Sequence, residues 1–314
     1  MAEMVKKATR ESYGLALVEL GKTNPDIVVL DADLASATKT LFFRDAFPDR
    51  FVDCGIAECN MIGVAAGLAT CGKIPFASSF AMFSAGRAFE QVRNSVGYPH
   101  LNVKIAGSHA GISVGEDGAT HQCLEDLALM RAIPGMVVLN PSDHYEMQAA
   151  VKAAAAYVGP VYLRLSRLAV ESFNNSDDYR FEIGKGVTLR GGKDITVIAT
   201  GLMVSRALQA VKELEKEGID ARLINLHTLK PIDRELIVRA ARETGKIVTV
   251  EEHNVIGGLG DAVCAVLCEE YPAPVVKIGV NDRFGHSGPA ADLLEKFGLC
   301  ASHIAEVVRR ELKK

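Results

Sequence analysis

The richest group of side chains that could do chemistry lies in residues 107–126, which read GSHAGISVGEDGATHQCLED. Within fourteen positions this segment holds His109, Glu116, Asp117, His121 and Gln122, and glycines stand at positions 107, 111, 115 and 118. Imidazole and carboxylate groups at this density can move protons and bind hydroxyl or phosphate groups. A solvated loop would account for His109 alone. It does not need two histidines and four glycines together, so the pattern favours a functional loop.

Two smaller segments carry weaker signals. Glu58 opens the apolar run ECNMIGVAAGLA, where the helix dipole favours a first-turn glutamate, and such a glutamate is expected to be partly exposed. Phe80 and Phe83 stand three residues apart, just after an apolar strand pattern. Taken alone, the glutamate is better explained as a helix-end charge and the two rings as core packing.

Two glycine-rich stretches imitate nucleotide-binding motifs. Residues 67–73 read GLATCGK, but Ile74 stands where a phosphate-binding loop needs a hydroxyl, and the stretch leaves a helix and enters a strand. Gly72 is therefore predicted to end a helix. Residues 257–260, GGLG, lack the full dinucleotide pattern and are interpreted as a loop. No set of cysteines and histidines has the spacing of a metal site, so no metal ligand is predicted in this chain.

Apolar, β-branched runs alternate with helical patterns along the chain, which predicts parallel sheets covered by helices. The expected strands are 27–31, 74–79, 103–106, 136–139 and 161–165, then 195–199, 221–226, 247–250 and 275–280. The expected helices include 58–70, 143–156, 204–217, 235–242 and 261–269. A polar stretch at 171–180 interrupts the alternation. We therefore expect two layered α/β domains, residues 1–173 and 190–314, joined by a linker at 174–189.

The bulk composition excludes several classes of protein. The 314 residues are 48% hydrophobic and 24% charged, with a net charge of −4, so there is no basic footprint for nucleic acid. No apolar run reaches the roughly 18 residues of a membrane-spanning helix, and the lysines near the N-terminus are not followed by the apolar core of a signal peptide. Seven irregularly spaced cysteines indicate free thiols, and we expect a cytoplasmic protein.

Taken together, the segments resemble one family, the thiamine-diphosphate-dependent transketolases. GIAECNMIGVAAGLA resembles the glutamate-bearing helix of their pyrimidine-binding domain, and SSFAMF resembles the aromatic stretch beside the cofactor's aminopyrimidine. GSHAGISVGEDGATHQ is similar to their long substrate-contacting loop. The resemblance continues through IPGMVVLNPSD, PVYLRLSR, ATGLMVSRA and RFGHSGPAADLLEKFG, and so covers nearly the whole chain. It implies a pyrimidine-binding domain followed by a transketolase C-terminal domain.

The resemblance also implies a missing part. Transketolases bind Mg²⁺ and the diphosphate of the cofactor in an N-terminal domain, through a GDG motif followed by asparagine. This chain contains no GDG. The resemblance therefore implies the C-terminal subunit of a split transketolase. Its partner would be an N-terminal subunit that carries the GDG motif and holds Mg²⁺, and the chain would also associate with a second copy of itself in a dimer core.

The cofactor side of the site is assigned by the resemblance to four residues. Glu58 matches the carboxylate that hydrogen-bonds a pyrimidine nitrogen and favours the imino tautomer, which then removes the thiazolium C2 proton. Phe80 and Phe83 match the aromatics around the pyrimidine ring, and Asp33 matches an aspartate that lines the site. The tyrosine found three residues beyond the second aromatic in many relatives is replaced here by Gly86.

The substrate side is assigned to five residues in the same way. His121 matches a histidine near the reacting hydroxyls, where it would also act in catalysis, and Asp117 matches a contact to the donor's C2 hydroxyl region. Arg10, His109 and Arg167 match positions that hold the sugar phosphate, and an arginine fork suits paired hydrogen bonds to phosphate oxygens. The implied activity is transfer of a two-carbon ketol unit from a ketose phosphate to an aldose phosphate.

Three alternatives stay open. A deoxyxylulose-phosphate-synthase-like subunit is the nearest alternative, although GEDGATHQ and the placing of Arg167 are more similar to transketolase. The β subunits of 2-oxo-acid dehydrogenases share the domain order but lack this loop. A non-catalytic regulatory partner of a transketolase could keep the fold. The presence of Glu58, His109, Asp117 and His121 argues against a decayed relative of that kind.

Overall fold

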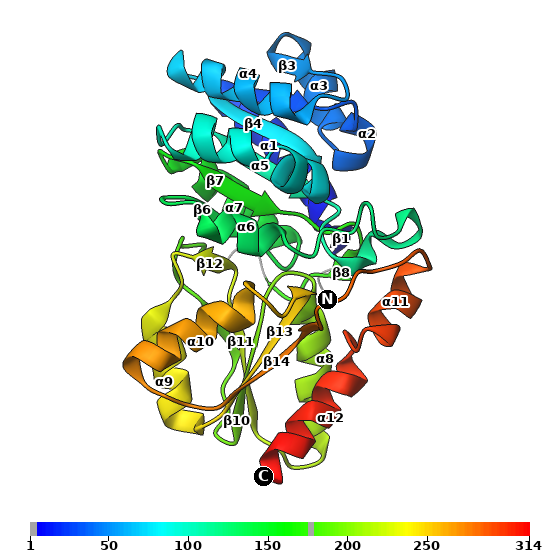
Figure 1. Ribbon diagram of the computed structural model, residues 1–314, viewed down its shortest axis with the longest axis vertical. Helices are drawn as coiled ribbons and strands as arrows, with labels where there is room; N and C mark the ends of the chain where they lie inside the picture. Colours follow the sequence, from blue (N-terminus) through cyan, green and yellow to red (C-terminus); the bar gives the residue numbers. More distant parts are fainter. Residues whose placement is uncertain (1–4, 175–178) are drawn as a thin grey trace.

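Two large β-sheets follow one another along the long axis of the molecule, the first built mostly from the N-terminal half of the chain and the second from the C-terminal half (Figure 1). The computed structural model describes residues 5–174 and 179–314, so residues 175–178 of the predicted linker lie outside the described residues. The rest of that segment packs against folded structure. Phe181 stacks on His227 with ring centroids 4.2 Å apart, and Ile183 packs against the core of the first domain.

The first sheet has seven strands in the order β12-β6-β7-β5-β4-β2-β3. β12 runs antiparallel to β6, and the other neighbours are parallel. The strands are β2 (Ile27–Asp31), β3 (Phe51–Asp53), β4 (Ile74–Phe80), β5 (Lys104–Ser108), β6 (Val137–Leu139), β7 (Val161–Arg164) and β12 (Thr228–Lys230).

Helices cover both faces of this sheet, because successive side chains of β2 point alternately into two different apolar cores. Val28 and Leu30 belong to one core with α4 and α6, whereas Ile27 and Val29 belong to another with α1 and α7. The helical segments are α1 (Thr9–Thr23), α2 (Ala35–Thr38), α3 (Leu41–Ala46), η1 (Pro48–Arg50), α4 (Glu58–Thr70), η2 (Met82–Arg87), α5 (Phe89–Gln91), η3 (Val92–Gly97), η4 (Ile112–Asp117), α6 (Asp126–Ala132) and α7 (His144–Ala156).

The second sheet has five strands in the order β14-β13-β10-β11-β9, in which only β9 is antiparallel to its neighbour. A separate two-stranded ribbon joins β1 (Lys6–Ala8) to β8 (Ala169–Glu171). The remaining strands are β9 (Val187–Arg190), β10 (Ile195–Ala199), β11 (Ala221–Asn225), β13 (Ile247–Asn254) and β14 (Val275–Val280). The helices are α8 (Met203–Lys216), α9 (Arg234–Thr244), α10 (Leu259–Glu270), α11 (Ala290–Lys296) and α12 (Ala301–Leu312).

The predicted fold class, two layered α/β units with largely parallel sheets, is confirmed. Strands β2, β10 and β14 and helix α4 have the predicted bounds. Gly72 follows the end of α4 with φ +82°, the left-handed conformation that favours glycine after a helix. The domain boundaries 1–173, 174–189 and 190–314 stay predictions.

Strand β13 and helix α10 differ from the predictions. β13 was expected to end at residue 250 but continues to Asn254 through three buried polar residues, Glu251, Glu252 and His253. Charged and polar residues in sequence usually indicate an exposed segment. Here they are buried because partners elsewhere in the fold satisfy them, and the sequence does not show those partners. The loop prediction for 257–260 is wrong for its second half, since α10 begins at Leu259.

The two halves share structure as well as a covalent connection. β12 follows the second half's β11 along the chain but pairs with β6 of the first sheet. One continuous apolar core contains Met130 from α6, Leu229 from β12 and Val263 from α10.

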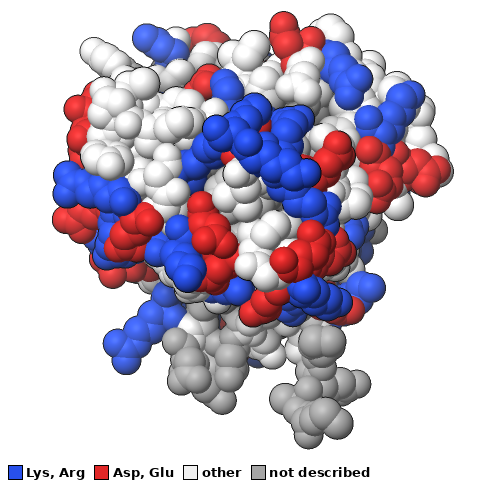
Figure 2. Space-filling view, turned by 90° about the horizontal axis from the view of Figure 1, so that it is seen from below, with Lys and Arg blue, Asp and Glu red and all other residues white. Residues whose placement is uncertain are grey.

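Acidic and basic side chains are intermixed on the face of the molecule shown in Figure 2. In the part of the chain that the structure describes, no helix combines the length and apolar character needed to cross a bilayer.

Candidate active site

The site lies where three neighbouring parallel strands end. β4 pairs with β2 on one side and with β5 on the other, so the carboxyl ends of all three strands meet at one edge of the sheet. Asp33 follows β2, Phe83 follows β4 and His109 follows β5. Asp33 and His109 have φ of 60° and 55°, a left-handed backbone that is uncommon outside glycine and often found at functional sites. Open α/β sheets bind ligands at this edge.

Glu58 is the first residue of α4, and its side chain is buried rather than partly exposed as expected. Its residue surface is 2% accessible. The partner of the carboxylate is Arg87, whose Nη1 donates to Glu58 Oε2 at 2.9 Å. The sequence-based expectation was wrong because η2, which carries Arg87, folds back over the start of α4. Glu58 is therefore a buried, ion-paired carboxylate rather than a solvated helix-end charge.

Four aromatic side chains form a cluster beside Glu58. The Phe80 and Phe83 rings are stacked with centroids 5.9 Å apart, and the His109 ring stacks on Phe80 at 4.0 Å. The His121 ring meets Phe83 edge-on at 5.2 Å. Phe80 ends β4, and the π-helical turn η2 then brings Phe83 around to the same side. Phe83 therefore lines the site, and Phe80, which is buried as the core-packing interpretation expected, stacks beside it.

A cleft of about 450 Å³ opens between these groups. Its lining residues come from the ends of β2, α4 and β4 and from the loop after β5: Ala32, Asp33, Leu34, Ile56, Glu58, Phe83, Arg87, Thr120 and His121. The cleft thus joins the predicted cofactor residues Asp33, Glu58 and Phe83 with the predicted substrate residue His121. Its size suits part of a small organic ligand, and the ionisable groups in its lining are the carboxylates of Asp33 and Glu58, the guanidinium of Arg87 and the imidazole of His121.

The protonation state of His109 follows from its contacts. Arg10 Nη1 lies 3.3 Å from His109 Nε2, and because arginine can only donate, Nε2 must accept. The proton of the neutral ring then sits on Nδ1, which donates to Ser108 Oγ at 2.9 Å. Burial, together with the nearby cations Arg10, Arg167 and Lys39, lowers the pKa of His109 to about 3. His109 is therefore a neutral hydrogen-bonding group at physiological pH.

The two predicted phosphate-binding arginines lie beside this histidine. Arg10, near the start of α1, donates from Nη1 to the Ala37 carbonyl at 2.8 Å, and its buried Nε has no partner among the described residues. Arg167 contacts the Val114 carbonyl and makes a 3.0 Å ion pair with Glu116. Burial and the charge of Arg167 lower the pKa of Arg10, as expected for cations gathered in one place. Such a cluster attracts an anion.

Asp117 is the predicted site residue that the structure does not draw into the cluster. It ends η4, its side chain is exposed, and among the described residues it makes no hydrogen bond or ion pair.

Two residues that the sequence analysis missed belong to the site. Arg87 contacts Glu58, and it is the single charge in the run SFAMFSAGRAF, a signal that could have been noticed. Lys39 adds positive charge near His109.

The second domain holds the substrate-side loop in place. Glu252 Oε1, on β13, accepts from the Ser113 backbone N–H at 2.6 Å. Gln122 donates across the domain boundary to the His286 carbonyl at 3.1 Å. Gly111 has φ +88° and lies against the Glu252 carboxyl, so that a Cβ there would overlap it. The glycine therefore lets the loop approach the second domain closely.

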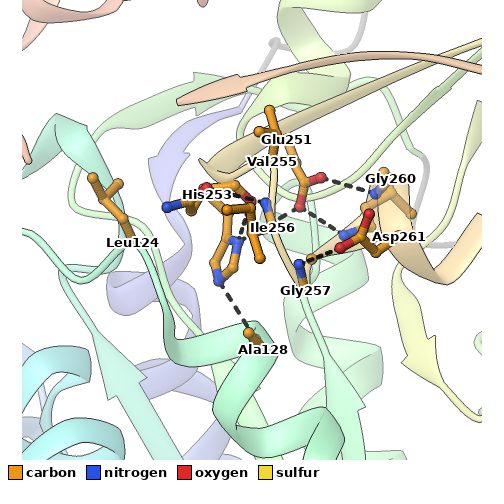
Figure 3. A network of polar contacts seen from close by, with 12 residues as sticks. Leu124, Ala128, Glu251, His253, Val255, Ile256, Gly257, Gly260 and Asp261 are labelled. Carbon is orange, nitrogen blue, oxygen red and sulfur yellow. Dashed lines mark hydrogen bonds and ion pairs between the residues drawn. The ribbon is translucent and has the colours of Figure 1, made fainter. Parts of the chain in front are cut away.

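Figure 3 shows how the end of β13 and the start of α10 are fixed next to this contact. The Glu251 carboxylate accepts from the N–H groups of Leu259 and Gly260 at the start of α10. His253 Nε2 accepts from the Ala128 N–H of α6, and its Nδ1 contacts the Asn254 carbonyl at 2.7 Å. His253 is thus a neutral bridge between the domains, in agreement with its pKa, which burial lowers to about 4.

Comparisons with known proteins agree with this arrangement. Residues 5–172 match the transketolase pyrimidine binding domain, and residues 184–304 match the transketolase C-terminal domain. The chain belongs to the transketolase family. A Methanocaldococcus jannaschii protein described as a transketolase C-terminal section is 50% identical over 312 residues, which cover 99% of this chain and 98% of that protein.

Two further relatives show how the length of this transketolase-family chain compares with that of full-length and split enzymes. Human transketolase is 40% identical over 314 residues, which cover 98% of this chain and 50% of that protein. A solved structure described as a split-gene transketolase, an inactive β4 tetramer, has a TM-score of 0.91 and 59% identity, with 98% of each chain covered. The chain thus spans about half of a full-length transketolase and nearly all of a split one.

In residues 5–174 and 179–314, no group of three histidine, cysteine, aspartate or glutamate side chains is placed to hold a metal ion. The features present fit the pyrimidine end of thiamine diphosphate instead. A buried carboxylate opens on the cleft, and Phe83 lines its wall with Phe80 stacked beside it.

Proposed function

We propose that this chain is the C-terminal subunit of a split transketolase, which transfers a two-carbon ketol unit from a ketose phosphate to an aldose phosphate. The observation that carries the proposal is the cleft that brings buried Glu58 together with Phe83 and His121. A carboxylate held in a low-dielectric site beside aromatic rings can orient and polarise a heterocycle. An imidazole on the opposite loop can exchange protons with a substrate hydroxyl.

Glu58, Phe80, Phe83 and Asp33 are the residues of this chain that would hold the pyrimidine end of thiamine diphosphate. The cofactor, when bound, supplies an electron sink for breaking a carbon–carbon bond next to a carbonyl. Glu58 would accept a hydrogen bond from the pyrimidine ring, and the two phenylalanines would keep the ring in the plane that this bond requires. The diphosphate and its Mg²⁺ would be held by the partner subunit.

On the substrate side, Arg10, His109 and Arg167 would bind the sugar phosphate. The two guanidinium groups supply the charge, and neutral His109, with Nδ1–H engaged by Ser108, turns its Nε2 toward Arg10. His121 would contact the reacting hydroxyls and pass protons to and from them. Asp117, which is exposed in this structure, would contact the donor only if the loop closes over it or the partner subunit covers it.

The proposed partner is an N-terminal subunit with the diphosphate-binding GDG motif. Human transketolase is twice as long as its match to this chain, and the split-gene relative with a similar fold is described as an inactive β4 tetramer. A dimer of this chain would form the middle of the assembly.

The seven cysteines are all free in the structure, which supports the prediction of a cytoplasmic location.

The deciding experiment is a ketol-transfer assay on the purified chain, on a GDG-containing subunit, and on the two together, each with and without thiamine diphosphate and Mg²⁺. We expect activity only in the mixture with cofactor. Condensation of pyruvate with glyceraldehyde phosphate is measured in parallel. Activity in that assay, without ketol transfer, would favour the deoxyxylulose-phosphate-synthase-like alternative. Full activity of this chain alone would contradict partner dependence. A mixture that assembles and stays inactive in both assays would favour the regulatory alternative.

A further inference from the structure

The contact between Glu58 and Arg87 has no place in the proposed catalytic cycle. A carboxylate that is 2% accessible needs a hydrogen-bonding or charged partner, because an unpaired buried charge is strongly destabilising. Among the described residues, Arg87 is the side chain that supplies it, at 2.9 Å. Yet Glu58 is also the group that the proposed function reserves for the pyrimidine ring.

Arg87 makes a second contact that points to the same conflict. Its guanidinium lies over the Phe83 ring, 4.6 Å from the ring centroid, and both side chains line the cleft. A planar group thus covers one face of Phe83 while donating a hydrogen bond to Glu58. Those are the two contacts, a stacked ring face and a hydrogen bond to the carboxylate, that the proposed function assigns to the aminopyrimidine.

The Arg87 side chain is far more exposed than the carboxylate that it contacts. Its side chain is 52% accessible, against 2% for that of Glu58. It is the last residue of η2 and follows Gly86, while the Arg87 carbonyl stays tied to α4 by the Cys59 thiol at 3.7 Å. The backbone is therefore held, and the guanidinium can turn into solvent without disturbing the sheet or α4.

We propose that Arg87 occupies the place of the aminopyrimidine ring in the cofactor-free subunit and must release Glu58 before the ring can bind. This inference rests on the proposed function. Arg87 neutralises the buried carboxylate, and it competes with the cofactor for the same oxygen and the same ring face. A protein whose binding-competent state is only partly populated shows a correspondingly weaker apparent affinity. Removal of the competitor should therefore tighten cofactor binding.

The first test measures cofactor affinity in the assembly of this chain with the GDG-containing subunit, by calorimetric titration with thiamine diphosphate in saturating Mg²⁺. Arg87→Met keeps the length of the side chain and removes its charge and donors. We expect the dissociation constant to fall by ~10-fold, the factor that corresponds to about 1.4 kcal/mol. Arg234→Met is the matched control, because Arg234 is 44% accessible and pairs with Glu269 and Glu270 in the second domain. Its affinity should equal that of the wild type.

The second test uses the free chain and needs no cofactor. Unfolding by urea is measured for Arg87→Met, Glu58→Gln and the double variant. Arg87→Met alone should lower stability, and Glu58→Gln should recover part of the loss, because the buried carboxylate is then neutral. Additive effects of the two substitutions would overturn the inference, and so would an Arg87→Met assembly that binds the cofactor as weakly as the wild type or more weakly. If the wild-type assembly binds no thiamine diphosphate, the proposed function fails and the inference with it.

Discussion

At the scale of single residues, the site is defined by how each ionisable group is buried. Glu58 is enclosed and paired with a half-exposed cation, His109 is enclosed among cations and is neutral, and Asp117 remains exposed. The same residue types in solvent would have none of these properties.

Glu58→Gln should slow activation of the cofactor. Glutamine keeps the size and a hydrogen-bonding oxygen but loses the charge that polarises the pyrimidine. Hydrogen–deuterium exchange at C2 of thiamine diphosphate, measured in the reconstituted assembly, should slow by about 10²–10⁴-fold. Glu235→Gln is the control, since Glu235 also lies in the first turn of a helix but is exposed. Exchange at the wild-type rate would remove Glu58 from the mechanism.

Arg167→Ala should weaken binding of phosphorylated sugars. The lost charged hydrogen bond corresponds to about 1.5–3 kcal/mol, which should appear as a raised KM for a ketose phosphate. KM for a non-phosphorylated donor such as hydroxypyruvate should barely change. Glu116→Gln serves as the control, because it removes the ion-pair partner of Arg167 and should leave the phosphate KM unchanged or lower. Equal losses for both donors would show that Arg167 acts on the loop through its contact with Val114 instead.

His109 should stay neutral well below its ordinary pKa of 6.5. Because its pKa in the folded chain is about 3, the unfolded chain takes up this proton first as pH falls. The residue's contribution to stability is therefore complete above pH 6.5 and is lost as pH falls toward 3, by up to about 1.4 kcal/mol per pH unit. Between pH 7.5 and pH 5 the wild type should lose more stability than His109→Asn. NMR of the imidazole nitrogens should show no titration of His109 above pH 5.

At the scale of elements, the functional loop depends on a strand of the other domain. The loop's glycines permit its shape, and β13 then fixes one end of η4 through Glu252 and the Ser113 N–H. Glu252 also lies close to Arg164, whose guanidinium donates to the Glu252 carbonyl and forms a buried ion pair with Asp126. The second domain thus acts on the site without lining the cleft.

Glu252→Ala should loosen residues 109–122 while leaving the cleft residues unchanged. The Ser113 N–H would lose its acceptor, which costs about 1–3 kcal/mol for a buried donor. We expect a lower melting temperature and faster amide hydrogen exchange across this loop. Glu252→Gln, which keeps an acceptor oxygen at the same place, should retain most of the protection. Equal protection in the wild type and Glu252→Ala would show that the other contacts of the loop suffice.

At the scale of the whole molecule, the two predicted domains share a core and a sheet. β12 extends the first sheet, and apolar residues from both halves form one cluster. Such an interface couples the unfolding of the two parts, unlike the loosely packed contacts of domains joined by a flexible linker.

The free chain should therefore unfold in one cooperative transition. Six of its seven tyrosines, Tyr13, Tyr98, Tyr145, Tyr157, Tyr162 and Tyr179, precede β9, and the chain has no tryptophan, so tyrosine fluorescence reports mainly on the first domain. Far-UV circular dichroism reports on both domains. Urea transitions followed by the two signals should coincide. Two separated midpoints would mean that the shared core does not couple the domains.

Much of this architecture could be predicted from the sequence because it is local. Runs such as residues 27–31 and 195–199 are buried on both faces, and their apolar letters predict strands without knowledge of the partners. The loop at 107–126 was recognisable because histidines, acids and glycines stand together. The family resemblance added the roles of Glu58, Phe80, Phe83, Asp33, Arg10, His109, Asp117, His121 and Arg167, which stay predictions.

The tertiary structure decided what joins residues far apart in the chain. Arg87 reaches Glu58 across 29 positions, Glu252 reaches Ser113 across 139, and β12 crosses to the other sheet. Periodicity and motif spacing describe the neighbours of a residue along the chain. They cannot show which distant group neutralises a buried charge or receives a buried N–H. For that reason the sequence predicted helix α4 and strand β13, but it did not predict that Glu58 is buried or that β13 continues through polar residues.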